Sequence, residues 1–251
     1  MLDKLKLSLL GNKLIYRALM SLDLVDDTLF TETKSITRVI HVGAGTAQER
    51  FLYNAFSKYV TWIEAHPEQF LISKKNISKF KNQQIFNYAV SNKNEFLNFH
   101  EVKNKWGFGP SSVFEWNPRN TVYEGLEKGK TFQVEAFNLS EIIKKEQIIL
   151  EDSPDKNLLV LDIQGAEFIA LQGASKDILM KFGYIQVESF NFEEYVGMAT
   201  DKEINDFLEI NGFERKYVLK KGFNFKESKY AADSIFVQKG LVAQDINKLF
   251  V

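Results

Sequence analysis

The feature that most constrains the fold of this chain is a short strand that ends in a glycine turn. Residues 38–42 read RVIHV and are mostly β-forming, and Gly43, Ala44 and Gly45 follow directly. Glycine lets the backbone turn tightly and come close to a ligand. Residues 46–60 then carry apolar side chains at helical spacing, which predicts an amphipathic helix. A strand, a glycine turn and a helix in this order are typical of a nucleotide-binding unit.

An acid at the end of the next strand supports this interpretation. The segment VTWIEA places Glu64 nineteen residues after Gly45, and an acid that binds a ribose stands about 20 residues beyond such glycines. A dinucleotide fold also needs a third glycine, where this chain has Gln48. S-adenosylmethionine carries no phosphate and needs only close backbone approach. Methyl transfer is therefore the leading hypothesis, with a nicotinamide-dependent oxidoreductase or an ordinary structural turn as alternatives.

Composition narrows the class of protein further. The chain has 251 residues, of which 45% are hydrophobic, enough for one sizeable core. The net charge is −1 and the lysines are scattered, so a nucleic-acid partner is disfavoured. Cysteine is absent, which excludes disulfides and thiolate metal sites. No apolar run approaches ~18 residues, so we expect no membrane span and a cytoplasmic protein.

The sequence divides into three parts. Residues 1–35 are expected to form accessory helices that pack against the domain or against a second subunit of a homodimer; the alternative is contact with a membrane surface. Residues 36–240 are expected to form the catalytic domain, and residues 241–251 a tail. Within the domain, residues 104–125 form a long irregular stretch, which is typical of a substrate loop or lid.

Strand and helix patterns alternate from about residue 36 to residue 190, which predicts an α/β fold with a doubly wound parallel sheet. Pro67 is expected to open a helix, and QIFNYAV at 84–90 reads as the third strand. FLNFHEV at 96–102 and FQVEAF at 132–137 read as extra strands on either side of the long loop. FERKYVL and DSIFVQK, at 213–219 and 233–239, are expected to pair as a closing antiparallel hairpin.

Three acids are expected at one edge of this sheet. Asp162 ends the buried strand LLVLDI, and Glu188 ends YIQVESF. If the last strand runs antiparallel to the others, its first residue, Asp233, lies at the same edge. The carboxyl edge of an open α/β sheet is where ligands bind, so these carboxylates are candidate functional groups.

Eight pieces of the sequence, in order over about residues 37–239, resemble the FkbM-type family of S-adenosylmethionine-dependent methyltransferases. They are HVGAGTAQE, WIEAHP, NYAVSN, PSSV, LLVLDIQGAEFIALQGA, VESF, NGF and DSIFV. The resemblance implies a seven-stranded Rossmann-like methyltransferase sheet, with the cofactor over Gly43–Gly45 and Glu64 on its ribose. It also implies O-methylation of sugars or natural products, often in bacterial polysaccharide biosynthesis. Three departures from the family pattern are His41, Ala47 and Gln164.

The residues assigned to the site follow from both arguments. For the cofactor they are His41, Gly43, Ala44, Gly45, Glu64, Ala65, His66, Ala89, Val90 and Asp162. For a small-molecule or carbohydrate acceptor they are Trp106, Ser111, Ser112, Asp233 and His100, and the aromatic side chains of Phe108 and Trp116 are further candidates for stacking on a sugar.

Methyl transfer is an in-line displacement in which the acceptor hydroxyl must also lose its proton. Asp162 and Glu188 are expected either to act as base and orienting group or to hold Mg²⁺ or Mn²⁺. Simple capping of the next helix is the structural alternative for both acids, and Glu167 is expected to play a structural role. A non-catalytic binding or scaffold protein with the same fold, motivated by His41 and Ala47, stays open as a rival.

Overall fold

The computed structural model describes residues 36–105, 107–119, 121, 125–224 and 228–241. Residues 36–241 form one compact unit. The expected N-terminal helices, the tail beyond residue 241 and Trp106 lie outside the described residues. No helix within the described ranges has the length and apolar character needed to cross a membrane.

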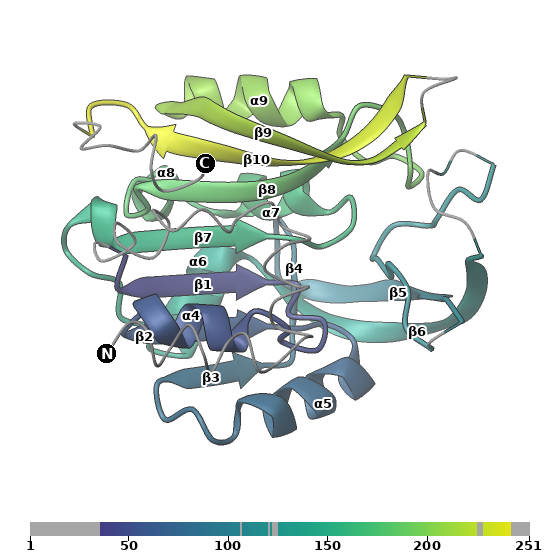
Figure 1. The fold of residues 1–251 in the computed structure, drawn as a ribbon, viewed down its shortest axis with the longest axis horizontal. Helices are drawn as coiled ribbons and strands as arrows, with labels where there is room; N and C mark the ends of the chain where they lie inside the picture. The colour runs from purple at the N-terminus through teal and green to yellow at the C-terminus, as the bar shows by residue number, and fades with distance from the viewer. Residues whose placement is uncertain (1–35, 106, 120, 122–124, 225–227, 242–251) are drawn as a thin grey trace, which may run out of the picture. The chain divides into compact units, whose positions relative to one another are not determined.

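The centre of the unit is a seven-stranded sheet, drawn in Figure 1. Its strand order is β3-β2-β1-β7-β8-β10-β9, and the first five of these run parallel. β10 is antiparallel to both of its neighbours, β8 and β9. The strands are β1 (Arg38–Val42), β2 (Tyr59–Ile63), β3 (Gln83–Phe86), β7 (Asn157–Leu161), β8 (Tyr184–Phe190), β9 (Phe213–Asn224) and β10 (Lys229–Gln238). The predicted doubly wound sheet with a closing hairpin is confirmed.

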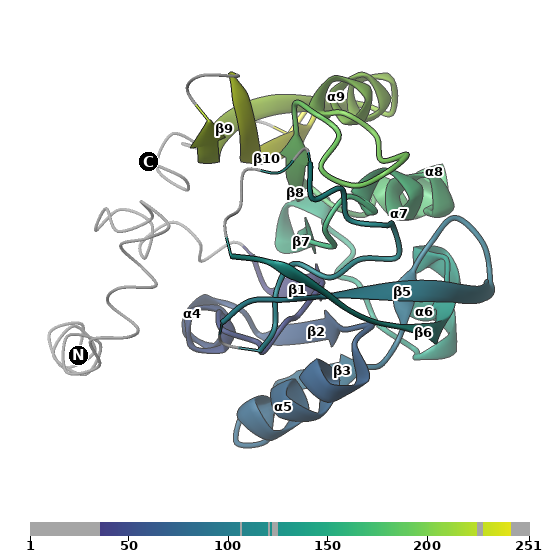
Figure 2. The same cartoon turned by 90° about the vertical axis from the view of Figure 1, so that its right-hand side faces the viewer.

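Helices cover both faces of this sheet, as Figure 2 shows for α4 on one face and α7 and α8 on the other. The helices are α4 (Arg50–Phe56), α5 (Pro67–Ile77), α6 (Leu139–Lys145), α7 (Glu167–Gly173), α8 (Lys176–Leu179) and α9 (Asp201–Ile210), and a 3₁₀ turn spans Pro154–Lys156. Alternate strand residues such as Ile40, Val42 and Leu159 pack with apolar residues of α6, α7 and α9 in the main core. Every residue of β1 and β7 is buried, as expected for strands covered on both faces.

A second, three-stranded sheet of order β4-β6-β5 lies beyond the carboxyl end of β1 (Figure 1). It contains β4 (Ala89–Val90), β5 (Glu95–Lys103) and β6 (Glu127–Phe137). β5 and β6 pair antiparallel and bracket the long loop, so the two extra strands that the sequence predicted are confirmed. This sheet places the loop above the edge at which the parallel strands end.

Three details differ from the sequence prediction. The expected third strand is two strands, β3 and β4. The side-chain amide of Asn87 donates to the carbonyls of Glu64 and Ala65, and the chain turns there before β4 pairs with β6. The helix after the glycine turn begins only at Arg50, since a turn with Ala47 in the left-handed region precedes it. Asp233 lies inside β10, four residues after its start, where its Cα is paired with that of Glu188.

Candidate functional site

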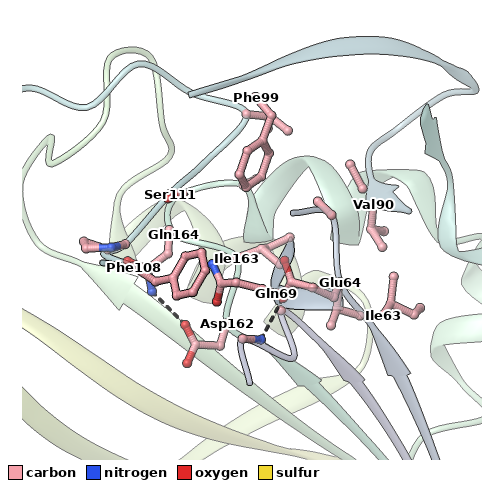
Figure 3. Close-up of a pocket in the computed structure, with 18 of the residues that line it drawn as sticks. Ile63, Glu64, Gln69, Val90, Phe99, Phe108, Ser111, Asp162, Ile163 and Gln164 are labelled. Atoms are coloured by element: carbon pink, nitrogen blue, oxygen red, sulfur yellow. Dashed lines mark hydrogen bonds between the residues drawn. The ribbon is translucent and has the colours of Figure 1, made fainter. Parts of the chain in front are cut away.

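A cavity of about 330 Å³ opens at the carboxyl edge of the parallel strands, between the main sheet and the second sheet (Figure 3). Its volume is at the lower end of the range for small-molecule sites. Eight of the residues assigned to the site from sequence line it: Gly43, Gly45, Glu64, Ala65, Ala89, Val90, Ser111 and Asp162.

The glycine turn forms the floor of this cavity. Gly43 has φ +90°, and a Cβ atom built on it would overlap the backbone oxygen of Asp162. The amides of Gly43 and Ala44 both donate to the carbonyl of Ile63, at 2.9 and 3.1 Å. Only glycine fits at position 43, because the turn passes directly against the end of β7.

Glu64 lies beside the turn with its carboxylate held by two backbone amides. Its Oε2 accepts from the Gly45 amide at 2.7 Å, and its Oε1 accepts from the His66 amide at 2.8 Å. Burial raises the pKa of Glu64 to about 7, against the opposing effect of these hydrogen bonds. Each carboxylate oxygen retains a further lone pair with which it can accept a hydroxyl donor from a ligand.

Asp162 and Glu188 are joined through a residue that lies between them. The side-chain amide nitrogen of Gln164 donates to Asp162 Oδ1 at 2.8 Å and to Glu188 Oε2 at 2.6 Å. Asp162 and Gln164 line the cavity, as Figure 3 shows, whereas Glu188 does not line it. Of the two predicted catalytic acids, Asp162 is therefore the one that faces the cavity.

The metal hypothesis does not fit this arrangement. Mg²⁺ and Mn²⁺ need several oxygen ligands around the ion, but here an NH₂ donor stands between the two carboxylates. Within the described residues, no three His, Cys, Asp or Glu side chains form a group suited to a metal ion. The amide supplies the positive end of a dipole where a cation would otherwise bridge the acids.

The long loop covers the cavity from above. Asn104, Phe108, Gly109, Pro110, Ser111 and Val113 line it from this side, together with Phe99 of β5. The Ser111 hydroxyl contributes to the loop's own structure, because it accepts from the Val102 amide at 2.9 Å. Trp116 packs instead in a buried cluster with Phe190 and Tyr195, which is why its ring is not available for stacking on a substrate.

The two histidines predicted to contact the cofactor lie outside the cavity lining. His41 is buried against Trp62, and its Nδ1 is 2.9 Å from the Tyr53 hydroxyl. Burial lowers the pKa of His41, which favours the neutral ring. His66 caps α5 by accepting the Glu68 amide at Nδ1, so its proton is on Nε2, 3.3 Å from Glu101 Oε1.

Four further predicted residues lie away from the cavity. Ala44 is buried inside the turn, and the Ser112 hydroxyl accepts the Phe114 amide. His100 is on β5 with its Nδ1 3.2 Å from the Thr131 hydroxyl. Asp233 is paired across the strands with Glu188, so the three acids do gather at one edge although only Asp162 reaches the lining.

The cavity also contains Gln69, Tyr88 and Phe99, which the sequence analysis did not single out. Gln164 was noted there only as a departure from the family pattern, and its bridging role was not predicted. Gln69 stands on the first turn of α5, just beyond Glu64, and this proximity was a usable signal. Phe99 and Tyr88 enter the cavity only because the second sheet folds over the first, and no local pattern marks that.

Comparison with known proteins gives the family. The model described as the methyltransferase FkbM domain matches residues 41–215, more than half of the chain. The chain belongs to the FkbM methyltransferase family. The resemblance noted from HVGAGTAQE and LDIQGAE is thereby confirmed. No curated protein matches the sequence.

Three solved structures with a similar fold are distant in sequence from this FkbM-family chain. An FkbM methyltransferase from Methylobacillus flagellatus has 9% identity and a TM-score of 0.45, over 80% of this chain and 44% of that one. Magnesium protoporphyrin IX methyltransferase from Synechocystis, solved with bound S-adenosylmethionine, has 9% identity and a TM-score of 0.48, over 90% and 81%. TrmK from M. capricolum, solved with S-adenosylhomocysteine, has 13% identity and a TM-score of 0.45, over 86% and 69%.

Proposed function

We propose that this chain is an S-adenosylmethionine-dependent O-methyltransferase, and that its acceptor is a hydroxyl of a sugar, a nucleotide-linked sugar or a glycan. The observation that carries the proposal is one cavity that brings together two sets of groups. The glycine turn and Glu64 form one set, and Asp162 with the Gln164 amide forms the other. Membership of the FkbM family supplies the reaction class.

Glu64 and the residues beside it suit the adenosine part of the cofactor. The free lone pairs of Glu64 can accept the two ribose hydroxyls, while Ile63, Ala89 and Val90 offer apolar surface for the base. Gly43 and Gly45 permit close approach of a ligand to the backbone. We assign the glycine turn and Glu64 to cofactor binding on these grounds.

The Asp162 carboxylate suits the reacting hydroxyl. Bound S-adenosylmethionine supplies an electrophilic methyl group, and the chain must align the acceptor oxygen with it and remove the hydroxyl proton. Of the acids Asp162, Glu188 and Asp233, Asp162 is the one that lines the cavity, and it is assigned as the base. The Gln164 amide orients the Asp162 carboxylate by donating to its Oδ1, and the loop above the cavity limits access of water.

The carbohydrate acceptor is supported by the mixture of groups around Asp162. Phe108 and Phe99 offer ring faces to the apolar side of a sugar, and the Asp162 carboxylate with the Gln164 amide offers both acceptors and donors to its hydroxyls. Apolar walls with a few placed polar groups are typical of small-molecule sites.

The experiment is calorimetric titration with S-adenosylmethionine, S-adenosylhomocysteine and NAD, on the wild type, Glu64→Gln and Glu68→Gln. Glutamine at position 64 would place an NH₂ group against one of the two backbone N–H donors that now contact Glu64. The affinity for S-adenosylmethionine and S-adenosylhomocysteine should therefore fall at least about tenfold. Glu68 is exposed and serves as the matched control. Preferential binding of NAD, or full binding by Glu64→Gln, would contradict the proposal.

Acceptor specificity is then tested by release of S-adenosylhomocysteine with a panel of nucleotide sugars and oligosaccharides. Asp162→Asn should retain cofactor binding and lose turnover, because the amide cannot take the hydroxyl proton.

A second candidate function is a binding protein without turnover. It is favoured by His41, whose ring packs on Trp62 and leaves no acid there for the methionine amino group. Cofactor binding with no turnover on any acceptor would support it.

A further inference from the structure

We infer that Tyr195 is a positioning residue that couples the loop above the cavity to the orientation of Gln164 between Asp162 and Glu188. The inference rests on the proposed function only for the catalytic role of the acids, since the contacts of Tyr195 do not depend on the reaction. It adds Tyr195, on the connection between β8 and α9, to the group formed by Asp162, Gln164 and Glu188, and the sequence did not indicate this.

The hydroxyl of Tyr195 stands between two acceptors from distant parts of the chain. It lies 2.9 Å from the Pro110 carbonyl oxygen and 3.0 Å from Gln164 Oε1. The side chain is fully buried, so these contacts are shielded from water. A phenol has one proton, which it can donate fully to only one of the two oxygens at a time.

The orientation of the Gln164 amide follows from its neighbours. With Oε1 toward Tyr195, its NH₂ group donates to both carboxylates; the flipped amide would face Asp162 and Glu188 with an oxygen. The Tyr195 hydroxyl favours the first orientation by donating to Oε1. The backbone of Gln164 is itself held in the left-handed region, at φ +56°. The residue is therefore presented in one defined position, at a cost in backbone strain.

The ring of Tyr195 is fitted to the same turn. A Cβ atom on Gly165, which has φ +94°, would lie 2.9 Å from Tyr195 Cδ2. Glycine at position 165 thus lets the ring pack directly on the backbone that follows Gln164. The segment LDIQG and Tyr195 act as one packed unit.

The loop is joined to the same connection by further contacts. Trp116 and Tyr195 form an antiparallel bridge, and the Val196 amide donates to the Glu115 carbonyl at 2.9 Å. The Trp116 indole donates to Glu194 Oε1 at 2.9 Å. The loop residues up to 117 are therefore hydrogen-bonded to residues 194–196. Within this segment, Tyr195 is the residue that also contacts Gln164, which bridges the two acids.

The consequence is that the position of the loop and the geometry of the acid pair depend on each other. The Pro110 carbonyl and Gln164 Oε1 share the single phenol proton of Tyr195, so a change at either oxygen alters the hydrogen bond that the other receives.

The test compares wild type, Tyr195→Phe and Tyr59→Phe in the full chain. Tyr195→Phe keeps the ring on Gly165 and removes only the hydroxyl. Tyr59 is the control because it is partly exposed and lies at the start of β2, at the end of that strand opposite to the cavity. Hydrogen exchange reports on peptides covering 108–117. The side-chain amide signals of Gln164, assigned by their absence in Gln164→Met, report on the bridge.

We expect Tyr195→Phe to raise the exchange rate of 108–117 by roughly fivefold, which corresponds to loss of one hydrogen bond. The Gln164 amide signals should move toward those of a solvated glutamine, and Tyr59→Phe should change neither readout. Faster loop exchange with unchanged amide signals would make Tyr195 a loop anchor alone and overturn the inference, as would no change in either.

Titration with S-adenosylhomocysteine separates this result from the proposed function. Tyr195→Phe should bind it within about twofold of wild type, because Tyr195 does not line the cavity and the Gly45–Glu64 hydrogen bond is untouched. Failure of the wild type to bind would reject the methyltransferase proposal, while the exchange and amide readouts would still decide the role of Tyr195.

Discussion

At the scale of single residues, Glu64 combines a structural role with the ribose contact proposed above. It ties the end of β2 to the glycine turn through the Gly45 amide and begins the connection to α5 through the His66 amide. Its burial raises its pKa to about 7, so both protonation states are populated near neutral pH. Ligand affinity is therefore expected to depend on pH.

We predict that S-adenosylhomocysteine binds roughly tenfold more tightly at pH 8 than at pH 6. The ionised form of Glu64 accepts two ribose hydroxyls better than the protonated form, and its ionised fraction rises about tenfold across this range. Calorimetry at several pH values measures the effect, with Glu64→Gln as the variant in which it should vanish. An affinity that is flat with pH would remove Glu64 from the ribose contact.

Glu167 is a buried acid with a structural role. Its Oε1 accepts the Ile163 amide at 2.8 Å, whereas its Oε2 is buried without a partner. Burial raises its pKa to about 8 from 4.5. Between these values the unfolded chain ionises first, so the free energy of unfolding falls as pH rises from 4.5 toward 8 and levels off above it.

We predict that the wild type loses on the order of 2–4 kcal/mol of stability through Glu167 between pH 5 and pH 8. Glu167→Gln should flatten this decline, since the amide cannot ionise, and most clearly between pH 7 and 8, where Glu64 contributes least. Urea denaturation at a series of pH values checks it, with the exposed Glu209→Gln as control. An equal decline in Glu167→Gln would contradict the assignment.

At the scale of elements, the turn between β1 and α4 is what brings the cavity floor against the end of β7. Gly43 makes the close approach to Asp162, and Ala47 completes the turn in a left-handed conformation that glycine adopts more easily. Alanine at position 47 therefore keeps the left-handed backbone conformation that glycine would adopt there, at a cost in backbone strain.

We predict that Gly43→Ala either fails to fold or loses several kcal/mol of stability and all cofactor binding, because its Cβ would meet backbone rather than a movable side chain. Gly240→Ala is the matched control: its φ is +88°, and nothing lies within 4 Å of an added Cβ. It should cost only about 1 kcal/mol, the usual penalty of a left-handed alanine. Thermal unfolding distinguishes the two, and equal costs would refute the steric argument.

At the scale of the whole molecule, the site is formed where two sheets meet. The main sheet supplies the glycine turn, Glu64 and Asp162 from the ends of neighbouring strands, and the second sheet carries the loop that covers them. A ligand in this cavity contacts both sheets, so its binding should stabilise the folded chain as a unit.

We predict that S-adenosylhomocysteine at a hundred times its dissociation constant raises the melting temperature by about 5–10 °C. Mass action supplies about 2.7 kcal/mol, and a chain of this size gains about 2–4 °C per kcal/mol. Glu68→Gln should show the same rise and Glu64→Gln almost none. A rise in Glu64→Gln equal to that of wild type would place the ligand elsewhere.

The sequence by itself determined the local elements and the class of the protein. Strand periodicity and the glycines at 43 and 45 predicted the parallel sheet and the turn, and placed Glu64 at the end of the next strand, because these features depend on neighbouring residues. The motifs HVGAGTAQE and LDIQGAE indicated the family that the domain match then confirmed.

Only the tertiary structure decided which side chains share the cavity. His41 and Asp162 both lie at the ends of adjacent strands, yet His41 packs on Trp62 while Asp162 faces the cavity. Gln164 and Tyr195 are thirty-one residues apart, and the Gln164 amide bridges acids on two strands. Such choices depend on how distant elements fill space against one another, and a pattern along the chain does not carry that information.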